Sequence, residues 1–432
     1  MKVYVILLGL FWAPFGATDD AGPTEQPPAE QPQQPEERSV GTLLDDETTV
    51  EMHDDTTLLR DVRSGGIKGS GLLVFDAFRF WVGGAIQYDY YNFDGIYNSS
   101  SEGARREGGS MRRFEGILRS QLYDWGEIKA QYDFDRGNFR DLYLRWVSKR
   151  KDTPLTITAG NQKEPLGLDN LIGNKSGIAQ ERSAPSYAFG SRRSLGVRLH
   201  KAFELAPEKR KFDYWKEDVA YMTTSVGVFT SDLDDTHDTD IAVTGRVTAG
   251  RVKQGTGTHV GISTSYREGQ YYRVSMRPEV NEADRVTLAQ PDGNTLGLLA
   301  FEAAYNRGPL HIQAEAYTAS YRGRVRGYGV GGYVQGGWYL TGESRTYQPR
   351  WGVLAPHAPS RNYAVEIFTR LSHTRGDDEI NGWNDFKSLT LGGNLYYRKL
   401  RFSANVLYGE SREPIITESD GIAVNLRVQY LL

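Results

Sequence analysis

Apolar and polar residues alternate along most of the chain from residue 80 onward. In the segment 126–135, for example, Ile128, Ala130 and Tyr132 alternate with Lys129 and Gln131. Successive side chains of a β-strand point to opposite faces of its sheet, so a period of two predicts strands with one apolar and one polar face. The pattern therefore favours an all-β architecture over a helical one.

The same alternation recurs in about sixteen segments, a number typical of bacterial transmembrane barrels. The predicted strands are 80–93, 112–123, 126–135, 139–148, 154–161, 193–200, 219–230, 240–250, 258–267, 295–306, 310–321, 328–340, 362–372, 388–398, 401–409 and 421–432. Several have about the ten residues that a tilted membrane-spanning strand needs. The predicted fold is an all-β transmembrane antiparallel β-barrel over residues 65–432, with both chain ends in the periplasm.

Composition supports this interpretation. The chain has 48 Gly and 26 Tyr but no Cys, and its mean hydropathy is −0.54. After residue 17 no segment approaches the roughly 20 apolar residues that a spanning helix requires. Only helices and closed barrels satisfy their backbone hydrogen bonds within a bilayer. A membrane protein with this sequence must therefore be a barrel.

The N-terminal segments differ from the rest. Met1-Lys2 is basic, residues 3–15 are apolar, and Gly16 and Ala17 are small, which predicts a signal peptide over residues 1–17. Residues 18–64 are rich in Pro, Glu and Gln and contain 13 Asp or Glu against three Arg, a net charge of −10. This composition predicts a disordered acidic periplasmic segment. Since the whole chain carries −4 and Lys2 contributes +1, residues 65–432 carry +5.

The connections between strands fit this topology in part. Five of the expected periplasmic connections are short, and the connections 162–192 and 268–294 on the outer side are long. Two further periplasmic connections, 201–218 and 341–361, are longer than the turns usual at that end of a barrel. These two long connections weaken individual strand boundaries more than they weaken the architecture.

Several motifs resemble those of the phosphate-selective porin O and P family. Gly160, Lys163 and Pro165 form a G-x-x-K-x-P pattern that precedes a long third loop in that family. Further similar patterns are Glu181-Arg182, Arg192-Arg193-Ser194-Leu195-Gly196-Val197, Gly342-Glu343-Ser344-Arg345 and Leu389-Thr390-Leu391-Gly392-Gly393-Asn394-Leu395-Tyr396. The resemblance implies a sixteen-stranded trimeric porin in which loop 3, about 162–192, folds into the lumen and cationic side chains line an anion path.

Two sets of cations are candidate pore residues. The pore-constriction or anion-binding candidates in loop 3 are Lys163, Lys175, Arg182, Arg192 and Arg193, and the lumen-lining candidates from strand alternation are Arg119, Lys129, Arg145, Arg198, Arg246, Arg370, Arg398 and Arg427. A small basic excess in a narrow constriction can enrich anions. The alternative is that these cations pair with acids and hold the loop to the wall, as neighbours such as Glu164 and Glu181 suggest.

The sequence favours a passive pore and no enzyme. The seven His are scattered and Cys is absent, so no catalytic or metal-binding constellation is predicted and no cofactor is expected. The leading hypothesis is an outer-membrane porin of a Gram-negative-type envelope that prefers phosphate or similar small anions. The alternatives are a weakly selective diffusion porin and a structural envelope protein that tethers through residues 18–64. Expected partners are two further copies in a homotrimer, outer-membrane lipid, lipopolysaccharide and a periplasmic or cell-wall partner of residues 18–64, but no nucleic acid.

Overall fold

A computed structural model describes most of the chain beyond its N-terminal region. The described residues are 73–75, 78–123, 125–148, 155–173, 175–191, 193–205, 218–230, 241–253, 255–271, 273–348, 351–356, 362–412 and 419–432. The predicted signal peptide (1–17) and acidic segment (18–64) lie outside them, as does Arg192. None of the helices in the described ranges is long and apolar enough to cross a membrane.

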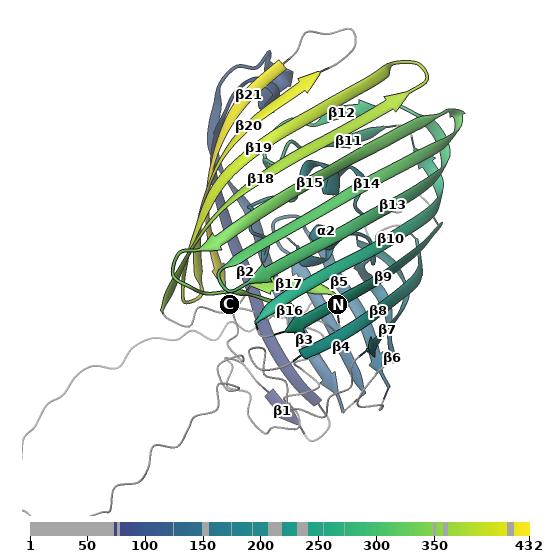
Figure 1. Ribbon diagram of the computed structural model, residues 1–432, viewed down its shortest axis with the longest axis vertical. Helices are drawn as coiled ribbons and strands as arrows, with labels where there is room; N and C mark the ends of the chain where they lie inside the picture. Colours follow the sequence, from purple (N-terminus) through teal and green to yellow (C-terminus); the bar gives the residue numbers. More distant parts are fainter. Residues whose placement is uncertain are drawn as a thin grey trace, which may run out of the picture. The chain divides into compact units, whose positions relative to one another are not determined.

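Sixteen antiparallel strands form a closed barrel, which confirms the predicted fold class (Figure 1). The barrel strands are β2 (Phe78–Phe93), β3 (Arg106–Leu122), β4 (Gly126–Asp133), β5 (Asn138–Val147), β6 (Leu155–Lys163), β7 (Arg193–Glu204), β8 (Asp218–Phe229), β9 (Ile241–Lys253), β10 (Thr256–Tyr271), β13 (Asp292–Arg307), β14 (Leu310–Val325), β15 (Gly327–Tyr339), β18 (Tyr363–Asp378), β19 (Gly382–Tyr397), β20 (Leu400–Arg412) and β21 (Ser419–Leu431). Pairing of β2 with β21 closes the barrel. The short β1 (Leu73–Phe75) adds to β2 beside the barrel.

The barrel presents apolar side chains outward and polar side chains inward. In β21, Leu426 and Val428 are 46% and 44% exposed, whereas Asn425 and Arg427 on the opposite face are 2% and 4% exposed. This distribution is the reverse of that in a soluble protein. It is stable where the outer face meets lipid tails and the inner face can satisfy its polar groups within the protein.

Among the described residues, four connections carry their own secondary structure, and the one from β2 to β3 contains the short 3-10 helix η3 (Gly95–Ser101). The connection from β6 to β7 contains α2 (Leu168–Ile172) and α3 (Ala184–Phe189). The outer connection from β10 to β13 forms a hairpin of β11 (Val274–Met276) and β12 (Val286–Ala289), and the connection from β15 to β18 forms a hairpin of β16 (Arg345–Gln348) and β17 (Val353–Pro356). The second hairpin explains why the predicted connection 341–361 is too long for a simple turn.

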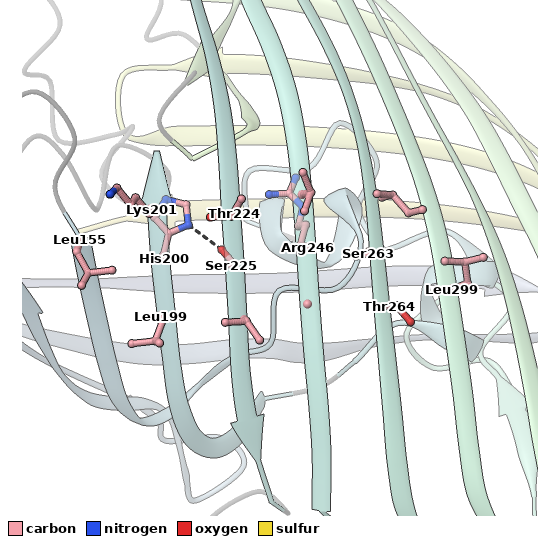
Figure 2. Close-up of a pocket in the computed structure, with 14 residues that line it drawn as sticks. Leu155, Leu199, His200, Lys201, Thr224, Ser225, Arg246, Ser263, Thr264 and Leu299 are labelled. Atoms are coloured by element: carbon pink, nitrogen blue, oxygen red, sulfur yellow. Dashed lines mark hydrogen bonds between the residues drawn. The ribbon is translucent and has the colours of Figure 1, made fainter. Parts of the chain in front are cut away.

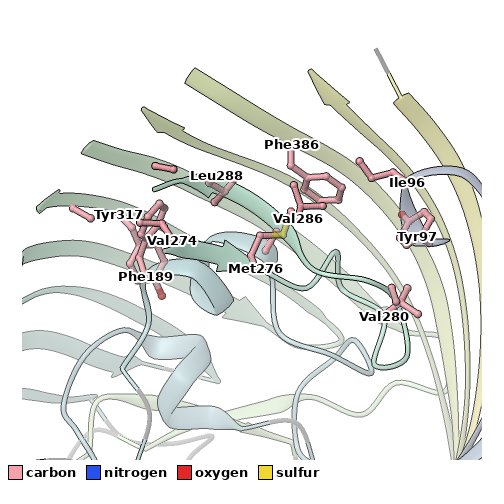
Figure 3. Packing of buried hydrophobic residues seen from close by; sticks show 14 of the residues in the cluster. Ile96, Tyr97, Phe189, Val274, Met276, Val280, Val286, Leu288, Tyr317 and Phe386 are labelled. Atoms are coloured by element: carbon pink, nitrogen blue, oxygen red, sulfur yellow. The ribbon is translucent and has the colours of Figure 1, made fainter. Parts of the chain in front are cut away.

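A buried apolar cluster joins the outer connections to the inner wall. Phe189 of α3, Met276 of β11 and Leu288 of β12 belong to it together with Tyr317 and Phe386 of the wall (Figure 3). These side chains lose contact with water when the connections fold against the wall, which provides a hydrophobic driving force for that packing. The β6–β7 and β10–β13 connections are therefore built into the barrel.

Candidate functional site

Loop 3, the connection from β6 to β7, is fixed to one side of the barrel by arginines. Four guanidinium groups of β16, β18, β20 and β21 donate hydrogen bonds to backbone carbonyls of residues 175–181. These bonds run from Arg401 to Lys175 (3.3 Å) and Ile178 (2.9 Å), from Arg345 to Ser176 (3.3 Å), from Arg370 to Glu181 (2.9 Å), and from Arg427 to Gln180 (2.6 Å). Because a guanidinium group presents five donors in a rigid fork, it can bind a carbonyl and a carboxylate together.

Three of these arginines also bind carboxylates. Arg427 lies 2.6 Å from Asp89 and 2.7 Å from Glu181. Arg345 lies 3.1 Å from Glu366, and Arg370 lies 3.5 Å from Glu279. The positive charge on this side of the barrel is thus largely compensated, and these arginines serve to hold loop 3 in place.

The loop acid Glu181 is held in its charged form. Burial alone would raise the pKa of the Glu181 carboxyl, but Arg112 and Arg427 together lower that pKa well below its usual value. Arg112 binds both oxygens of Glu181, at 2.7 and 2.9 Å. Bidentate pairs of this kind are among the stronger polar interactions in proteins. Glu181 therefore links β3 and β21 through the loop.

Carboxylates occupy the N-terminal ends of both loop helices. Glu315 of β14 accepts hydrogen bonds from the backbone N–H groups of Leu168 (2.5 Å) and Asp169 (2.7 Å) at the start of α2. Glu279 of the β10–β13 connection accepts one from Ala184 (2.9 Å) at the start of α3. The first N–H groups of a helix have no partner within the helix, so these side chains satisfy donors that would otherwise be unpaired. Both helix ends are consequently closed to other anions.

Two β-bulges add arginines to the inner face of the opposite wall. In β3, Gln87 pairs with Arg113 and Tyr88 with Met111, so Arg112 is an extra residue. In β5, Gln131 pairs with Asp141 and Tyr132 with Phe139, which leaves Arg140 as the extra residue. A bulge shifts the alternation by one position. Arg112 therefore faces inward beside Arg113, and Arg140 beside Asp141.

Arg113, Arg140, Arg182 and Arg193 form what we term the arginine cluster. They lie close enough to repel one another electrostatically, and Arg140, Arg182 and Arg193 are half-buried. Burial and the neighbouring Arg193 and Arg113 lower the pKa of the loop residue Arg182 to about 10, against the opposing effect of Asp169. Arg182 thus remains charged at neutral pH.

Two carboxylates near the arginine cluster each form ion pairs with two cations. Glu115 lies 2.7 Å from Arg113 and 2.5 Å from Lys175. Asp141 likewise lies 2.9 Å from Lys129 and 2.5 Å from Arg193. One negative charge cannot neutralise two positive ones. This region between loop 3 and the β3–β7 wall consequently keeps an excess of positive charge.

Further along the same wall, cations hold the β16–β17 hairpin. Arg246 binds Glu302 (2.7 Å) and donates to the carbonyls of Trp351 (3.2 Å) and Gly352 (2.7 Å). The Trp351 ring stacks on His200, with centroids 4.4 Å apart and planes 12° apart. Figure 2 shows His200 joined to Ser225 of the neighbouring strand β8 by a hydrogen bond of 2.7 Å. The hairpin is thereby attached to the inside of β7–β9.

Comparison with known proteins identifies the family. The family model for phosphate-selective porin O and P matches residues 80–432. The chain belongs to this family. It is an outer-membrane porin of a Gram-negative bacterium, and the resemblance predicted from its sequence motifs is confirmed.

Two curated relatives and two solved structures are similar to this porin. Porin O of Pseudomonas aeruginosa is 24% identical over 413 residues, which cover 82% of this chain and 88% of that protein. An uncharacterized protein of Caulobacter vibrioides is 29% identical over 223 residues, 48% of this chain and 43% of that protein. OmpT of Vibrio cholerae superposes with a TM-score of 0.53 at 10% identity, covering 84% of this chain and 100% of that chain. The outer membrane channel DcaP of Acinetobacter baumannii superposes with a TM-score of 0.50 at 12% identity, covering 85% of this chain and 99% of that chain. At these identities the two structures show a shared fold.

The loop 3 candidates have separate positions in the porin. Lys163 is the last residue of β6, and its ammonium donates to the carbonyl of Leu171 (3.0 Å). Lys175 is buried against Glu115, whereas Arg182 and Arg193 belong to the arginine cluster. Arg192 lies outside the described residues. The structure therefore brings together two of the five candidates, and it places Lys175 in a structural pair.

The candidates from strand alternation fall into three groups. Arg370 and Arg427 hold loop 3, as described above. Arg119, Lys129, Arg145, Arg198 and Arg246 face inward from β3, β4, β5, β7 and β9. Arg398 does not line the lumen, and that prediction is wrong. The predicted strand 388–398 ends at Tyr397, so Arg398 lies in the following turn, exposed and with φ of 52°.

Several residues important to this arrangement were not predicted. Arg112 and Arg140 face inward only because of the bulges, for which alternation gives no signal. Arg401 could have been found, because it shares the polar face of its strand with Ser403 and Asn405. Glu279 and Glu315 could not be identified from the sequence, because the backbone N–H groups that they bind, those of Ala184 and Asp169, are 95 and 146 residues away.

Proposed function

We propose that this porin prefers anions, with phosphate or a similar small oxyanion as its solute. The observation that carries the proposal is the arginine cluster, in which half-buried cations lie together while the nearby carboxylates Glu115 and Asp141 each serve two cations. Two comparisons support the proposal: this porin belongs to a family described as phosphate-selective, and it is similar to Porin O. The guanidinium fork also matches the oxygens of phosphate.

The size of the effect follows from electrostatics. A unit charge about 4 Å from an ion contributes roughly 4 kcal/mol at an effective dielectric constant near 20, before desolvation is subtracted. Even a net gain of about 1.4 kcal/mol changes the relative occupancy of anions and cations tenfold. A constriction enclosed by protein also weakens screening by salt. A few uncompensated charges are therefore sufficient for selectivity.

Reversal potentials in a KCl gradient test the proposal. The variant with Arg140→Gln and Arg182→Gln removes two charges of the arginine cluster that have no carboxylate within ion-pair distance among the described residues. We expect the anion-to-cation permeability ratio to fall about tenfold, corresponding to roughly 1.4 kcal/mol. Arg322→Gln is the matched control, because Arg322 is exposed near the outer end of β14 and faces away from the lumen.

An unchanged ratio in the double variant would favour the alternative of a weakly selective diffusion porin. The other alternative, a structural role for residues 18–64, needs a different measurement. Deletion of residues 18–64 should leave the conductance unchanged in that case and impair envelope integrity.

We propose further that three copies assemble through the outer face of β3–β6. The strands β4, β5 and β6 have only 8, 10 and 9 residues, against 16 in β13, β14, β18 and β19. An aromatic group lies outward there, with Phe134 5.1 Å from Phe114 and 5.2 Å from Tyr132. A low wall bearing aromatic side chains suits contact with another copy. Phe114→Ser with Phe134→Ser should convert trimers to monomers on semi-native gels.

A further inference from the structure

The outer wall of β6–β13 carries a groove. It has a volume of 570 Å³, and its apolar lining includes Leu199, Val226, Val247 and Ile262. These four side chains are 42%, 49%, 44% and 42% exposed, so they belong to the outward face of the barrel. The groove therefore opens toward the membrane, and His200, Arg246 and Ser263, which also border it, are buried side chains of the inward face of the same strands.

Gly245 of β9 creates this groove. It pairs with Val226 on β8 and with Thr264 on β10, and Val226 in turn pairs with Leu199 on β7. The four positions thus form one row across four strands, with a residue lacking a side chain in the middle. A Cβ atom added at Gly245 would have as its nearest neighbour the Ser225 carbonyl at 3.7 Å, an ordinary contact. The depression is open space that a hydrocarbon chain can fill.

One end of the groove is positively charged. Lys201 lines it beside Leu155 and Thr224, with which it is paired across β6 and β8 (Figure 2). Arg251 and Lys253 of β9 are exposed at the same end of the barrel. None of the described residues that line the groove is Asp or Glu. This end would therefore attract a negatively charged group.

The charged end faces the periplasm. β7 descends to the end of the barrel at which β2 begins and β21 ends, and in bacterial barrels with an even number of strands this is the periplasmic end. Lys201 is the fourth residue from the end of β7. It can therefore extend its ammonium to the interface while its carbon chain stays on the apolar wall.

We infer that this groove binds an anionic glycerophospholipid of the periplasmic leaflet. One acyl chain lies over Gly245 between Leu199, Val226 and Val247. The phosphate of the headgroup binds the ammonium of Lys201 and the hydroxyl of Thr224. Because the groove lies on the lipid-facing side, the inference is independent of the anion preference of the pore.

Native mass spectrometry of the full chain in detergent tests the inference. The protein is incubated with equal amounts of phosphatidylglycerol and phosphatidylethanolamine, and the retained lipids are counted. We expect one tightly held phosphatidylglycerol per barrel in the wild type. Lys201→Gln should reduce the preference for phosphatidylglycerol about fivefold, the change expected for one lysine near an anionic surface. Gly245→Leu fills the groove and should abolish retention of either lipid there.

Gly297→Leu is the matched control for the filled groove. Gly297 of β13 also faces outward, has no atom within 4 Å of an added Cβ, and does not line the groove. This variant should retain phosphatidylglycerol like the wild type. An unchanged reversal potential and heat-modifiable migration on gels would show that each variant is folded.

Three results would overturn the inference. The first is equal retention of phosphatidylglycerol by Gly245→Leu and Gly297→Leu. The second is retention of lipopolysaccharide in place of phospholipid. The third is a loss of trimers in Gly245→Leu, which would make the groove a contact between copies of the chain.

Discussion

Two walls of the barrel use arginine in different ways. On the β18–β21 wall, Arg370 and Arg427 donate to carbonyls of loop 3 and bind carboxylates as well. On the β3–β7 wall, Arg140 and Arg193 lie near other arginines, and Asp141 serves Arg193 and Lys129 together. The cations of the first wall fix the loop, as does Arg112 of β3, whereas Arg140 and Arg193 of the second wall leave positive charge beside the pore.

This contrast shows why arginines in a pore cannot simply be counted. An inward arginine contributes to selectivity only if its charge is not balanced by a nearby carboxylate, and alternation along a strand reveals orientation but not balance. Desolvated charge pairs are costly to break even when they add little net stability. The two walls should therefore respond differently to removal of a single arginine.

Removal of Arg427 should have the largest effect. Arg427→Met leaves Asp89 and Glu181 buried without this partner and frees the carbonyl of Gln180. Loss of one member of a buried ion pair costs about 3–5 kcal/mol. We expect the temperature at which the barrel unfolds on semi-native gels to fall, and single-channel conductance to rise as loop 3 loosens.

Arg140→Met provides the comparison on the other wall. The Nε atom of Arg140 has no hydrogen-bond partner among the described residues, and its neighbours in the arginine cluster repel it. We expect little change in unfolding temperature but a lower preference for anions. Equal destabilisation by the two substitutions would contradict the division between a loop-holding wall and a charged wall.

Acidification should loosen loop 3 only at very low pH. The pKa of Glu181 is lowered in the folded protein, so its charge stabilises the fold above the ordinary value of about 4.3. That contribution is lost only as the pH falls through the lowered pKa. The fluctuations of the single-channel current should therefore not increase between neutral pH and about pH 4.

The variant Arg112→Gln makes this prediction sharper. Without Arg112, only Arg427 opposes the effect of burial, so the pKa of Glu181 should rise toward its ordinary value and current fluctuations should begin at a higher pH than in the wild type. Arg105→Gln, in an exposed outer connection, is the control. Identical onset of fluctuations in both variants would exclude Glu181 as the group that titrates.

Removal of the Trp351 ring should have the smallest effect. Trp351→Ala loses the stack on His200 and the contact with Arg145, whose guanidinium lies 5.8 Å from the ring centroid. Such contacts are worth about 0.5–1.5 kcal/mol each. We expect a modest rise in conductance as the β16–β17 hairpin moves more freely. Trp383→Ala, near Arg375 at the other end of the barrel, should not change conductance.

The barrel strands were predictable because lipid and lumen impose opposite preferences on successive residues. Each predicted strand corresponds to one of the sixteen barrel strands, including the last, whose alternation from Ile422 to Tyr430 is regular. Alternation was less informative at strand ends, where Arg398 belongs to a turn. It also failed at the bulges, since one extra residue such as Arg140 reverses the inward and outward positions on one side of it.

The arrangement inside the barrel could not be predicted in the same way. The hairpin β11–β12 has strands of only three and four residues, too short to produce a recognisable pattern. Arg427 and Gln180 are 247 residues apart in the sequence, and only the closed barrel brings them together. The candidate cations could therefore be proposed from the sequence, but their division between the two walls depends on these long-range contacts.

The capping of α2 and α3 by Glu315 and Glu279 has a consequence for the speed of transport. Backbone N–H groups at a helix end are a rigid, preorganised site that can retain an oxyanion for a long time. In this porin the carboxylates of Glu315 and Glu279 already accept hydrogen bonds from the N–H groups at the starts of α2 and α3, so these groups are not available to a passing anion. An anion in the pore would instead meet flexible guanidinium and ammonium side chains, and weak binding of that kind permits rapid release. For the anions that we propose as solutes, we therefore expect short residence times, as a pore driven only by a concentration gradient requires.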